Sequence, residues 1–114
     1  MNYVDGFVAA VKNAKREEYR AFAEKSVPMF KEHGALKVVE TWADDVPEGE
    51  VTSFTMAVKR EADESVVFSW ITWASKEARD AAWAKIMEDD RMQAEMPFDG
   101  KRLIHGGFQV IVDG

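Results

Sequence analysis

The chain contains no cysteine, which excludes disulfides, thiolate nucleophiles and cysteine-ligated metal sites. It also has no apolar run approaching the roughly 20 residues that a membrane-spanning helix needs. The first residues lack the basic head and apolar core of a signal peptide. These absences are compatible with a reducing compartment, and we expect a soluble, cytoplasmic protein with no membrane partner.

Basic charge is scarce as well. Fifteen Lys and Arg residues stand against 21 Asp and Glu residues, so the formal net charge is -6. Such a chain repels the phosphate backbones of nucleic acids unless its basic residues gather on one face. The basic group Lys12, Lys15 and Arg16 is followed at once by Glu17 and Glu18. We therefore expect no nucleic-acid partner.

The usual patterns of metal and cofactor sites are missing too. Only two histidines occur, His33 and His105, and no HxH or HxxxH spacing is present. The acidic run at 44–50 matches no EF-hand loop and is typical of a solvated turn. Glycine-rich nucleotide loops and the GxSxG nucleophile motif are absent. The sequence thus predicts neither a bound metal nor a cofactor.

What the chain does contain is the apolar periodicity of one folded domain. Its 114 residues, 46% of them hydrophobic and 32% charged, are typical of one compact core, so we assign residues 1–114 to a single domain. Alternation of apolar residues predicts strands at 3–11, 36–43, 52–59, 66–73 and 101–112. Spacings of three and four predict helices over about 14–33 and 75–90.

Local signals refine these elements. Ser75 is a plausible N-cap of the second helix, and Gly34 is placed to end the first. Pro28 interrupts the first helix, and predicts either a kink or a restart with Ser26 as the new N-cap. The pair Gly106-Gly107 predicts a bend or bulge in the last strand.

The resulting order, β-α-β-β-β-α-β, indicates an α+β fold. It is a ferredoxin-like split βαβ plan with an antiparallel sheet, an extra strand in its centre and two helices on one face. Two helices leave the second face of the sheet uncovered, yet several strands are apolar on both faces. We therefore expect a homodimer in which two identical sheets pack face to face.

Three motifs carry a family resemblance: Tyr3-Val4-Asp5-Gly6-Phe7, Glu40-Thr41-Trp42-Ala43-Asp44-Asp45-Val46-Pro47, and Met96-Pro97-Phe98-Asp99-Gly100-Lys101-Arg102 followed by Gly106-Gly107-Phe108. Together they resemble the bacterial YbaA-like family of small uncharacterised proteins, domain of unknown function 1428, nearly end to end. The resemblance implies the dimeric α+β barrel arrangement, and it assigns no biochemical role.

Two carboxylates are candidate acid or base groups. Asp5 alternates with large apolar residues on the first strand, and Glu40 does so on the second. A carboxylate in such surroundings is desolvated unless it is paired, which raises its pKa and suits it to proton transfer. The alternative is that an internal partner such as Arg102, Lys37 or a backbone amide satisfies each carboxylate.

Candidate ligand-binding residues surround these carboxylates. Arg102 could clamp an acidic ligand with its planar guanidinium, or it could form an internal salt bridge to Asp99, Asp5 or Glu40. Asp99 and His105 are further candidates, with His105 on the face of the last strand opposite Arg102. The aromatic residues Tyr3, Trp42 and Trp70 could line an apolar cavity between two sheets, or they could simply fill that interface.

Two functions remain open at this stage. The first is a homodimer that binds, and could transform, a small hydrophobic or aromatic molecule in an inter-sheet cavity without a tightly bound metal. In this hypothesis Asp5 and Glu40 are the catalytic groups. The alternative is a non-catalytic dimeric module that recognises a protein partner through an edge strand or through the acidic turn at 44–50.

Overall fold

The computed structural model describes residues 2–93 and 95–114. The described residues form a four-stranded antiparallel sheet in the order β2-β3-β1-β4. Its strands are β1 (Tyr3–Lys12), β2 (Lys37–Glu40), β3 (Glu64–Trp73) and β4 (Ile104–Gln109). The helices are α1 (Arg16–Glu32), the single-turn α2 (Phe54–Ala57) and α3 (Lys76–Ile86). This is the predicted ferredoxin-like α+β fold, without the extra strand.

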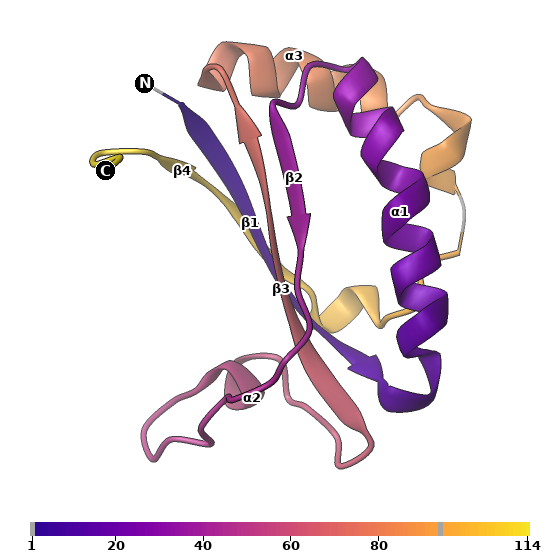
Figure 1. Ribbon diagram of the computed structural model, residues 1–114, viewed down its shortest axis with the longest axis vertical. Helices are drawn as coiled ribbons and strands as arrows, with labels where there is room; N and C mark the ends of the chain where they lie inside the picture. The colour runs from indigo at the N-terminus through magenta and orange to yellow at the C-terminus, as the bar shows by residue number, and fades with distance from the viewer. Residues whose placement is uncertain (1, 94) are drawn as a thin grey trace.

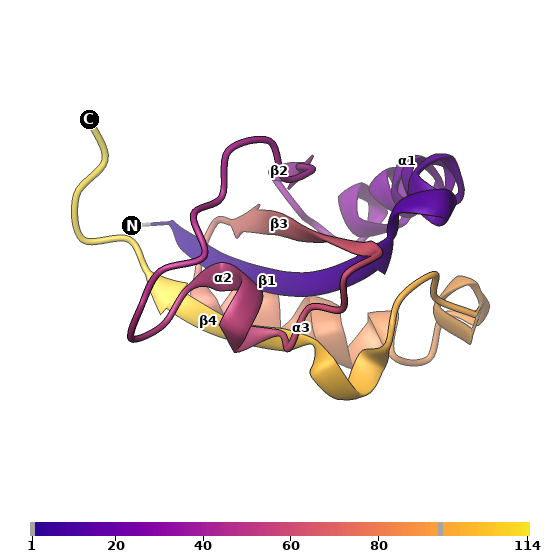
Figure 2. The ribbon, with the colours of Figure 1, turned by 90° about the horizontal axis from the view of Figure 1, so that it is seen from below.

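Helices α1 and α3 cover the same face of the sheet, as predicted (Figure 1). The strands run between these two helices on one side and the α2 loop on the other, and Figure 2 shows the same arrangement from below. No helix of the described residues is both long and apolar enough to cross a membrane.

Strand β1 lies at the centre of the sheet and sets its register. Tyr3 pairs with Trp73 of β3 and with Gln109 of β4, and the pairing with β3 continues to Lys12 and Glu64. Because side chains alternate along a strand, the odd-numbered residues of β1 face the helices. The core lies on this side, and its fully buried side chains include Val11, Met29, Val67, Trp73 and Ile86.

Helix α1 runs unbroken through Pro28, so the predicted restart is wrong. Ser26 does not cap a new helix, because its hydroxyl donates to the Ala23 carbonyl oxygen within the same helix. The predicted end of the helix is confirmed. His33 is the C-cap residue, and Gly34 follows with a φ of 108°, a left-handed conformation that glycine adopts without strain.

The strand predicted at 52–59 is wrong, since this segment contains helix α2. The Ser53 hydroxyl accepts a hydrogen bond from the Met56 backbone N–H, which is the geometry of an N-cap. Lys59, with a φ of 50°, ends the turn. Alternation of Phe54, Met56 and Val58 indicated a strand, but in the helical turn only Phe54 and Val58, four residues apart, lie on the same side.

Other boundaries shift by a few residues. Strand β2 is shorter than the predicted 36–43, although Thr41 and Ala43 continue backbone hydrogen bonds to β3. Helix α3 begins after the predicted N-cap Ser75 and ends at Ile86 rather than near 90. A 3-10 turn occupies Gly100–Arg102 where the last strand was expected to begin.

The predicted bulge at Gly106-Gly107 is also wrong, because β4 pairs with β1 in continuous register. Gly107 instead makes room for the side chain of Tyr3. A Cβ atom there would lie 2.7 Å from Cε2 of Tyr3, and closer still to the Tyr3 hydroxyl. The glycine thus allows the Tyr3 ring to cross β4.

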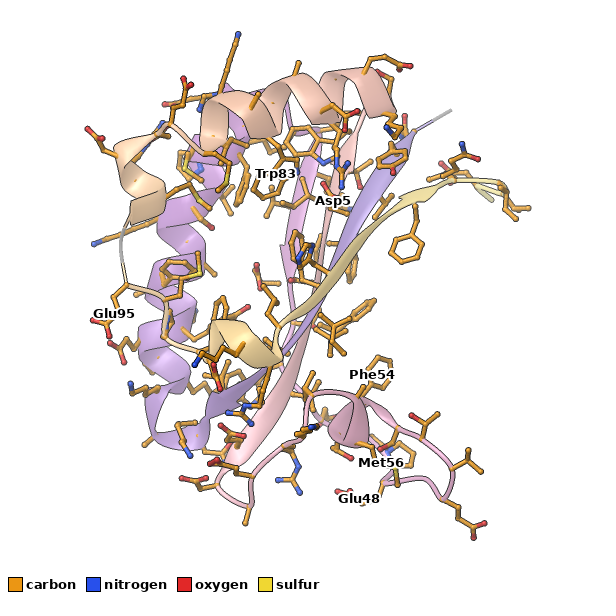
Figure 3. The ribbon with its side chains drawn as sticks, turned by 180° about the vertical axis from the view of Figure 1, so that it is seen from behind. Asp5, Glu48, Phe54, Met56, Trp83 and Glu95 are labelled. Carbon is orange, nitrogen blue, oxygen red and sulfur yellow. The ribbon has the colours of Figure 1, made fainter. Side chains whose placement is uncertain are left out.

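The face of the sheet opposite α1 and α3, termed the open face below, carries large apolar side chains. Phe68 and Trp70 of β3 lie beside Ile104 and Phe108 of β4 across β1. Phe68 is 43% exposed and Phe108 62% exposed. Phe54 of α2 packs edge-on against Phe68 with ring centroids 6.0 Å apart, and Figure 3 shows it away from α1. The prediction of apolar residues on both faces is confirmed.

Candidate functional site

A cavity of about 650 Å³ lies between the helix-covered face of the sheet and the helices. Most of its lining is apolar or aromatic, from Phe7, Ala9, Tyr19, Phe22, Phe30, Val67, Ile71, Trp83, Met87, Met92, Met96, Phe98 and Leu103. Its polar lining comes from Asp5, Ser26, Glu40, Ser69, Arg79, Asp80 and His105. The cavity is thus a largely apolar hollow with a few polar groups at defined places.

Phe98 forms one wall of this cavity. Its ring meets Tyr19 at 6.4 Å and Phe22 at 6.5 Å between centroids, both in edge-on geometry. It follows Pro97, which is buried. The Met96-Pro97-Phe98 motif therefore folds back over α1, and with it the C-terminal part of the chain contributes to the cavity.

Methionines form much of the remaining C-terminal lining. Met87, Met92 and Met96 all line the cavity, and Met87 and Met96 are 64% and 36% exposed. Methionine side chains are unbranched and polarizable, so they adapt to apolar groups of different shape.

Asp5 lies at the α3 end of the cavity and is 3% exposed. Its carboxylate accepts hydrogen bonds from Nε1 of Trp73 at 2.9 Å and Nε1 of Trp83 at 2.8 Å. Arg79 donates to it through Nη2 at 2.7 Å and through Nε. Figure 3 shows Asp5 and Trp83 close together beneath α3. The internal partner of Asp5 is therefore Arg79, a residue that was not among the predicted partners.

Glu40 is placed differently, at the boundary between β2 and α1. The Tyr19 hydroxyl donates to Glu40 Oε2. Although the residue is exposed overall, burial of the carboxyl end raises the pKa of Glu40, and hydrogen bonds from Tyr19 and Ser69 offset part of this rise. Burial and the negative charge of Glu40 also raise the pKa of Tyr19, so the phenol keeps its proton and remains a donor.

His105 of β4 also lines the cavity. It is exposed, and its ring stacks on Phe7 with centroids 6.5 Å apart. The structure thus brings three of the predicted site residues, Asp5, Glu40 and His105, to one cavity.

Arg102 and Asp99 lie outside the cavity lining. Arg102 donates from Nη1 and Nη2 to the two carboxylate oxygens of Glu64, both at 2.8 Å, and from Nε to Asp99. Asp99 also accepts from the Lys101 backbone N–H. The predicted salt bridge between Arg102 and Asp99 is confirmed, whereas Asp5 and Glu40 are not its partners.

The predicted aromatic walls are distributed over three places. Tyr3 belongs to the core, where the Arg79 guanidinium lies over its ring at 5.3 Å. Trp70 is on the open face beside Phe68. Trp42 lines a second, smaller pocket of about 320 Å³ with Arg16 over its ring. None of these three lines the large cavity, and a hollow between the sheets of two copies stays a prediction.

Several residues of the site were not predicted from the sequence. Tyr19, Arg79 and Trp83 were not among the predicted site residues. The available signal was spacing: Arg79 and Trp83 lie four residues apart on α3 and so share one helix face. Within residues 2–93 and 95–114, no group of three His, Asp or Glu side chains is arranged to hold a metal ion.

The chain is similar in sequence to the members of one protein family. A family model described as "Protein of unknown function (DUF1428)" matches residues 2–100. The "Uncharacterized protein YbaA" of Escherichia coli strain K12 is 60% identical over 116 residues, covering 99% of both chains. The protein of the same name from Shigella flexneri matches equally well.

Similar solved structures are more distant in sequence. A dimeric ferredoxin-like protein from an uncultured marine organism has a TM-score of 0.65 at 12% identity, with both chains fully covered. A variant of SnoaB, a cofactor-independent oxygenase from Streptomyces nogalater, has a TM-score of 0.64 at 13% identity, covering 98% of this chain and 95% of that one. These likenesses confirm the predicted fold.

Proposed function

The chain belongs to the DUF1428 family of proteins of unknown function, which is the YbaA-like family indicated by its motifs. From this premise we propose that the protein binds a small, largely apolar aromatic molecule. The ligand occupies the cavity between the sheet and the helices of each chain. The protein acts as a homodimer joined through the open faces of its sheets.

The lining of the cavity is the observation that carries this proposal. Its volume of about 650 Å³ falls within the range of about 300–1,000 Å³ that is typical of small-molecule sites. The aromatic rings of Phe7, Phe30, Trp83 and Phe98 provide flat apolar walls. Few polar groups interrupt them, so an aromatic ligand with one or two polar substituents fits this chemistry.

The open face supports the dimer. Phe68, Ile104 and Phe108 remain between 42% and 62% exposed in the single chain, and a contiguous apolar surface of this kind is typical of an interface. A second copy supplies a sheet of matching size and chemistry through a two-fold axis. The fold is shared with a protein described as dimeric, which is compatible with this assembly.

Among the carboxylates of the cavity, Glu40 is the candidate acid or base. Asp5 accepts hydrogen bonds from two indoles and a guanidinium, and this saturation favours a structural role. Glu40 has a single polar partner within α1, the Tyr19 hydroxyl, and its basicity is raised by burial. Glu40 is therefore the carboxylate that we assign to proton exchange with a bound ligand.

The alternative, a protein-interaction module that uses the acidic turn at 44–50, has less support. Glu48 of this turn accepts from the Thr55 hydroxyl at 2.9 Å and from Arg60 at 3.4 Å. The turn is thus partly folded back on the chain.

Native mass spectrometry on gently purified protein tests the proposal. The variant Ser26→Phe places a ring in the cavity, because Ser26 of α1 lines it, whereas Ala21→Phe adds the same bulk at an exposed position of the same helix. We expect a dimer that carries an additional small-molecule mass in the wild type and in Ala21→Phe, and no such mass in Ser26→Phe. An empty wild-type protein, or equal occupancy of both variants, would contradict ligand binding in this cavity.

A further inference from the structure

We propose that the Tyr19–Glu40 pair recognises a weakly acidic hydroxyl group, so that the ligand is an aromatic molecule bearing a phenol or an enol. This inference rests on the proposed ligand cavity and specifies its ligand. It starts from a pair of polar groups, on α1 and β2, placed within a largely apolar lining.

The pair has acceptor capacity that the fold does not use. A carboxylate has about four lone-pair positions on its two oxygens. The Tyr19 hydroxyl occupies one of them on Glu40 Oε2, and the Ser69 hydroxyl is a second donor to the group. The remaining positions can accept a hydrogen bond from a ligand. Tyr19 in turn fixes the orientation of the carboxylate from the helix side.

The pair also separates two hollows. Tyr19 and Glu40 line both the large cavity and the smaller pocket, which contains Arg16, Arg20 and Trp42. An aromatic ligand in the large cavity can therefore place its hydroxyl group at the Tyr19–Glu40 pair while its ring stays among apolar side chains. The smaller pocket, whose Arg16 and Arg20 are exposed, leads from the pair to solvent and gives a proton on Glu40 a route out.

The charges around the cavity favour a neutral donor over an anionic ligand. Asp5, Glu40 and Asp80 all line it, and a bound carboxylate or phosphate would be repelled by them. Arg79, the cation among them, is already paired with Asp5 and Asp80. A neutral hydroxyl avoids this repulsion and gains a charge-assisted hydrogen bond.

The chemistry of this contact balances without another reactant. The ligand O–H donates to a Glu40 oxygen, and complete transfer of the proton yields a phenolate or enolate and a neutral Glu40 carboxylic acid. No electron is lost or gained, and the total charge is unchanged. Burial raises the pKa of Glu40, which strengthens it as a proton acceptor relative to an exposed carboxylate.

A matched pair of fluorescent probes tests the inference. 2-Naphthol carries the required hydroxyl on an apolar ring system, and 2-methoxynaphthalene lacks the donor. The quantity measured is the ratio of their dissociation constants, obtained by fluorescence titration of the wild type and of Glu40→Gln. Glu18→Gln, at an exposed position of α1 that lines neither hollow, is the control. We expect the preference for 2-naphthol to fall by about tenfold or more in Glu40→Gln and to be unchanged in Glu18→Gln.

A second variant separates the two members of the pair. In Tyr19→Phe the carboxylate loses one of its two internal donors but keeps its charge and the Ser69 donor, so the preference for 2-naphthol is expected to persist or to rise. Loss of the preference in Tyr19→Phe, or an equal preference in the wild type and Glu40→Gln, would overturn the inference while both probes still bind the cavity. If neither probe binds the wild type, or if Ser26→Phe binds both as tightly, the proposed cavity itself fails.

Discussion

Trp83 Nε1 and Asp5 Oδ2 lie 2.8 Å apart, so a buried carboxylate joins α3 to the central strand of the sheet. Trp73 and Arg79 donate to the same carboxylate. The hydrogen bonds come from three residues that are distant from Asp5 in sequence. They fix the position of α3, and with it one end of the cavity.

Replacing Asp5 by Asn is expected to destabilise the fold strongly. The amide removes the charge that pairs with Arg79 and directs N–H donors at a site surrounded by donors. Breaking a buried ion pair in this way costs about 3–5 kcal/mol. Urea unfolding, followed by tryptophan fluorescence, measures the loss. Asp80→Asn, at the exposed partner of Arg79, is the control and should change stability little. A catalytic role for Asp5 would instead require Asp5→Asn to remain as stable as the wild type.

The pair of Glu64 and Arg102 predicts a specific loss of stability in acid. Hydrogen bonds from Arg102 hold the pKa of Glu64 at about 2, below its ordinary value of 4.5. Because the folded-state pKa is the lower one, this stabilisation is complete above pH 4.5 and disappears as the pH falls towards 2. We expect Glu64→Gln to lower the free energy of unfolding by about 1–3 kcal/mol at neutral pH, and the difference from the wild type to vanish near pH 2.

Urea titrations at a series of pH values measure this difference. Glu61→Gln provides the control, because Glu61 is an exposed partner of Lys12 and its contribution to stability should be small. A difference in the free energy of unfolding between the wild type and Glu64→Gln that stays constant from pH 7 to pH 2 would contradict the lowered pKa of Glu64.

The open face predicts a variant that separates the dimer. Phe68 lies on β3 between Phe54 and Trp70, with ring centroids 6.0 and 5.6 Å away. A carboxylate at this position would be desolvated without a partner in a face-to-face dimer, and this penalty amounts to several kcal/mol. Phe68→Glu should therefore raise the dimer dissociation constant by at least about a hundredfold.

Sedimentation velocity over a concentration series measures the association. Met87→Glu is the control, because Met87 is exposed on the helix side of the sheet and its replacement should leave the dimer intact. A wild-type protein that sediments as a monomer at all concentrations would refute the dimer.

Gly107 and Gly100 form a matched pair for a test of packing. A Cβ atom at Gly107 would overlap the Tyr3 ring, whereas a Cβ atom at Gly100 has no neighbour within 4 Å. Tyr3 is in the core and cannot move freely, so we expect Gly107→Ala to cost about 1–3 kcal/mol of stability. Gly100→Ala should be close to neutral. Equal unfolding midpoints for the two variants would show that the Tyr3 ring can shift.

Periodicity predicted the elements that are long enough to repeat their pattern. β1, β3, α1 and α3 were each predicted because eight or more residues display an apolar pattern. The short segment around Phe54 was predicted wrongly as a strand, since three alternating apolar residues are too few to establish that period. The signal that decides between them is the N-cap Ser53, whose hydroxyl meets the Met56 N–H.

The site was less predictable than the fold. The sequence indicated that Asp5 and Glu40 were unusual carboxylates, but it could not select their partners. Arg79 reaches Asp5 from 74 positions along the chain, and Glu64 rather than Asp5 pairs with Arg102. Such pairings depend on the relative placement of helices and strands, and a charged residue in a sequence does not specify which opposite charge lies within a few ångströms.

The central position of β1 determines when this strand can find its partners during synthesis on the ribosome. Its two neighbours are β3, which ends at Trp73, and β4, which ends at Gln109. A nascent chain must therefore grow past residue 64 before β1 has any strand partner, and past residue 104 before the second edge of β1 begins to be covered. During this interval an apolar strand presents unpaired backbone groups, the condition that promotes strand addition between chains. Slow translation between β3 and β4 would prolong this exposure and favour aggregation.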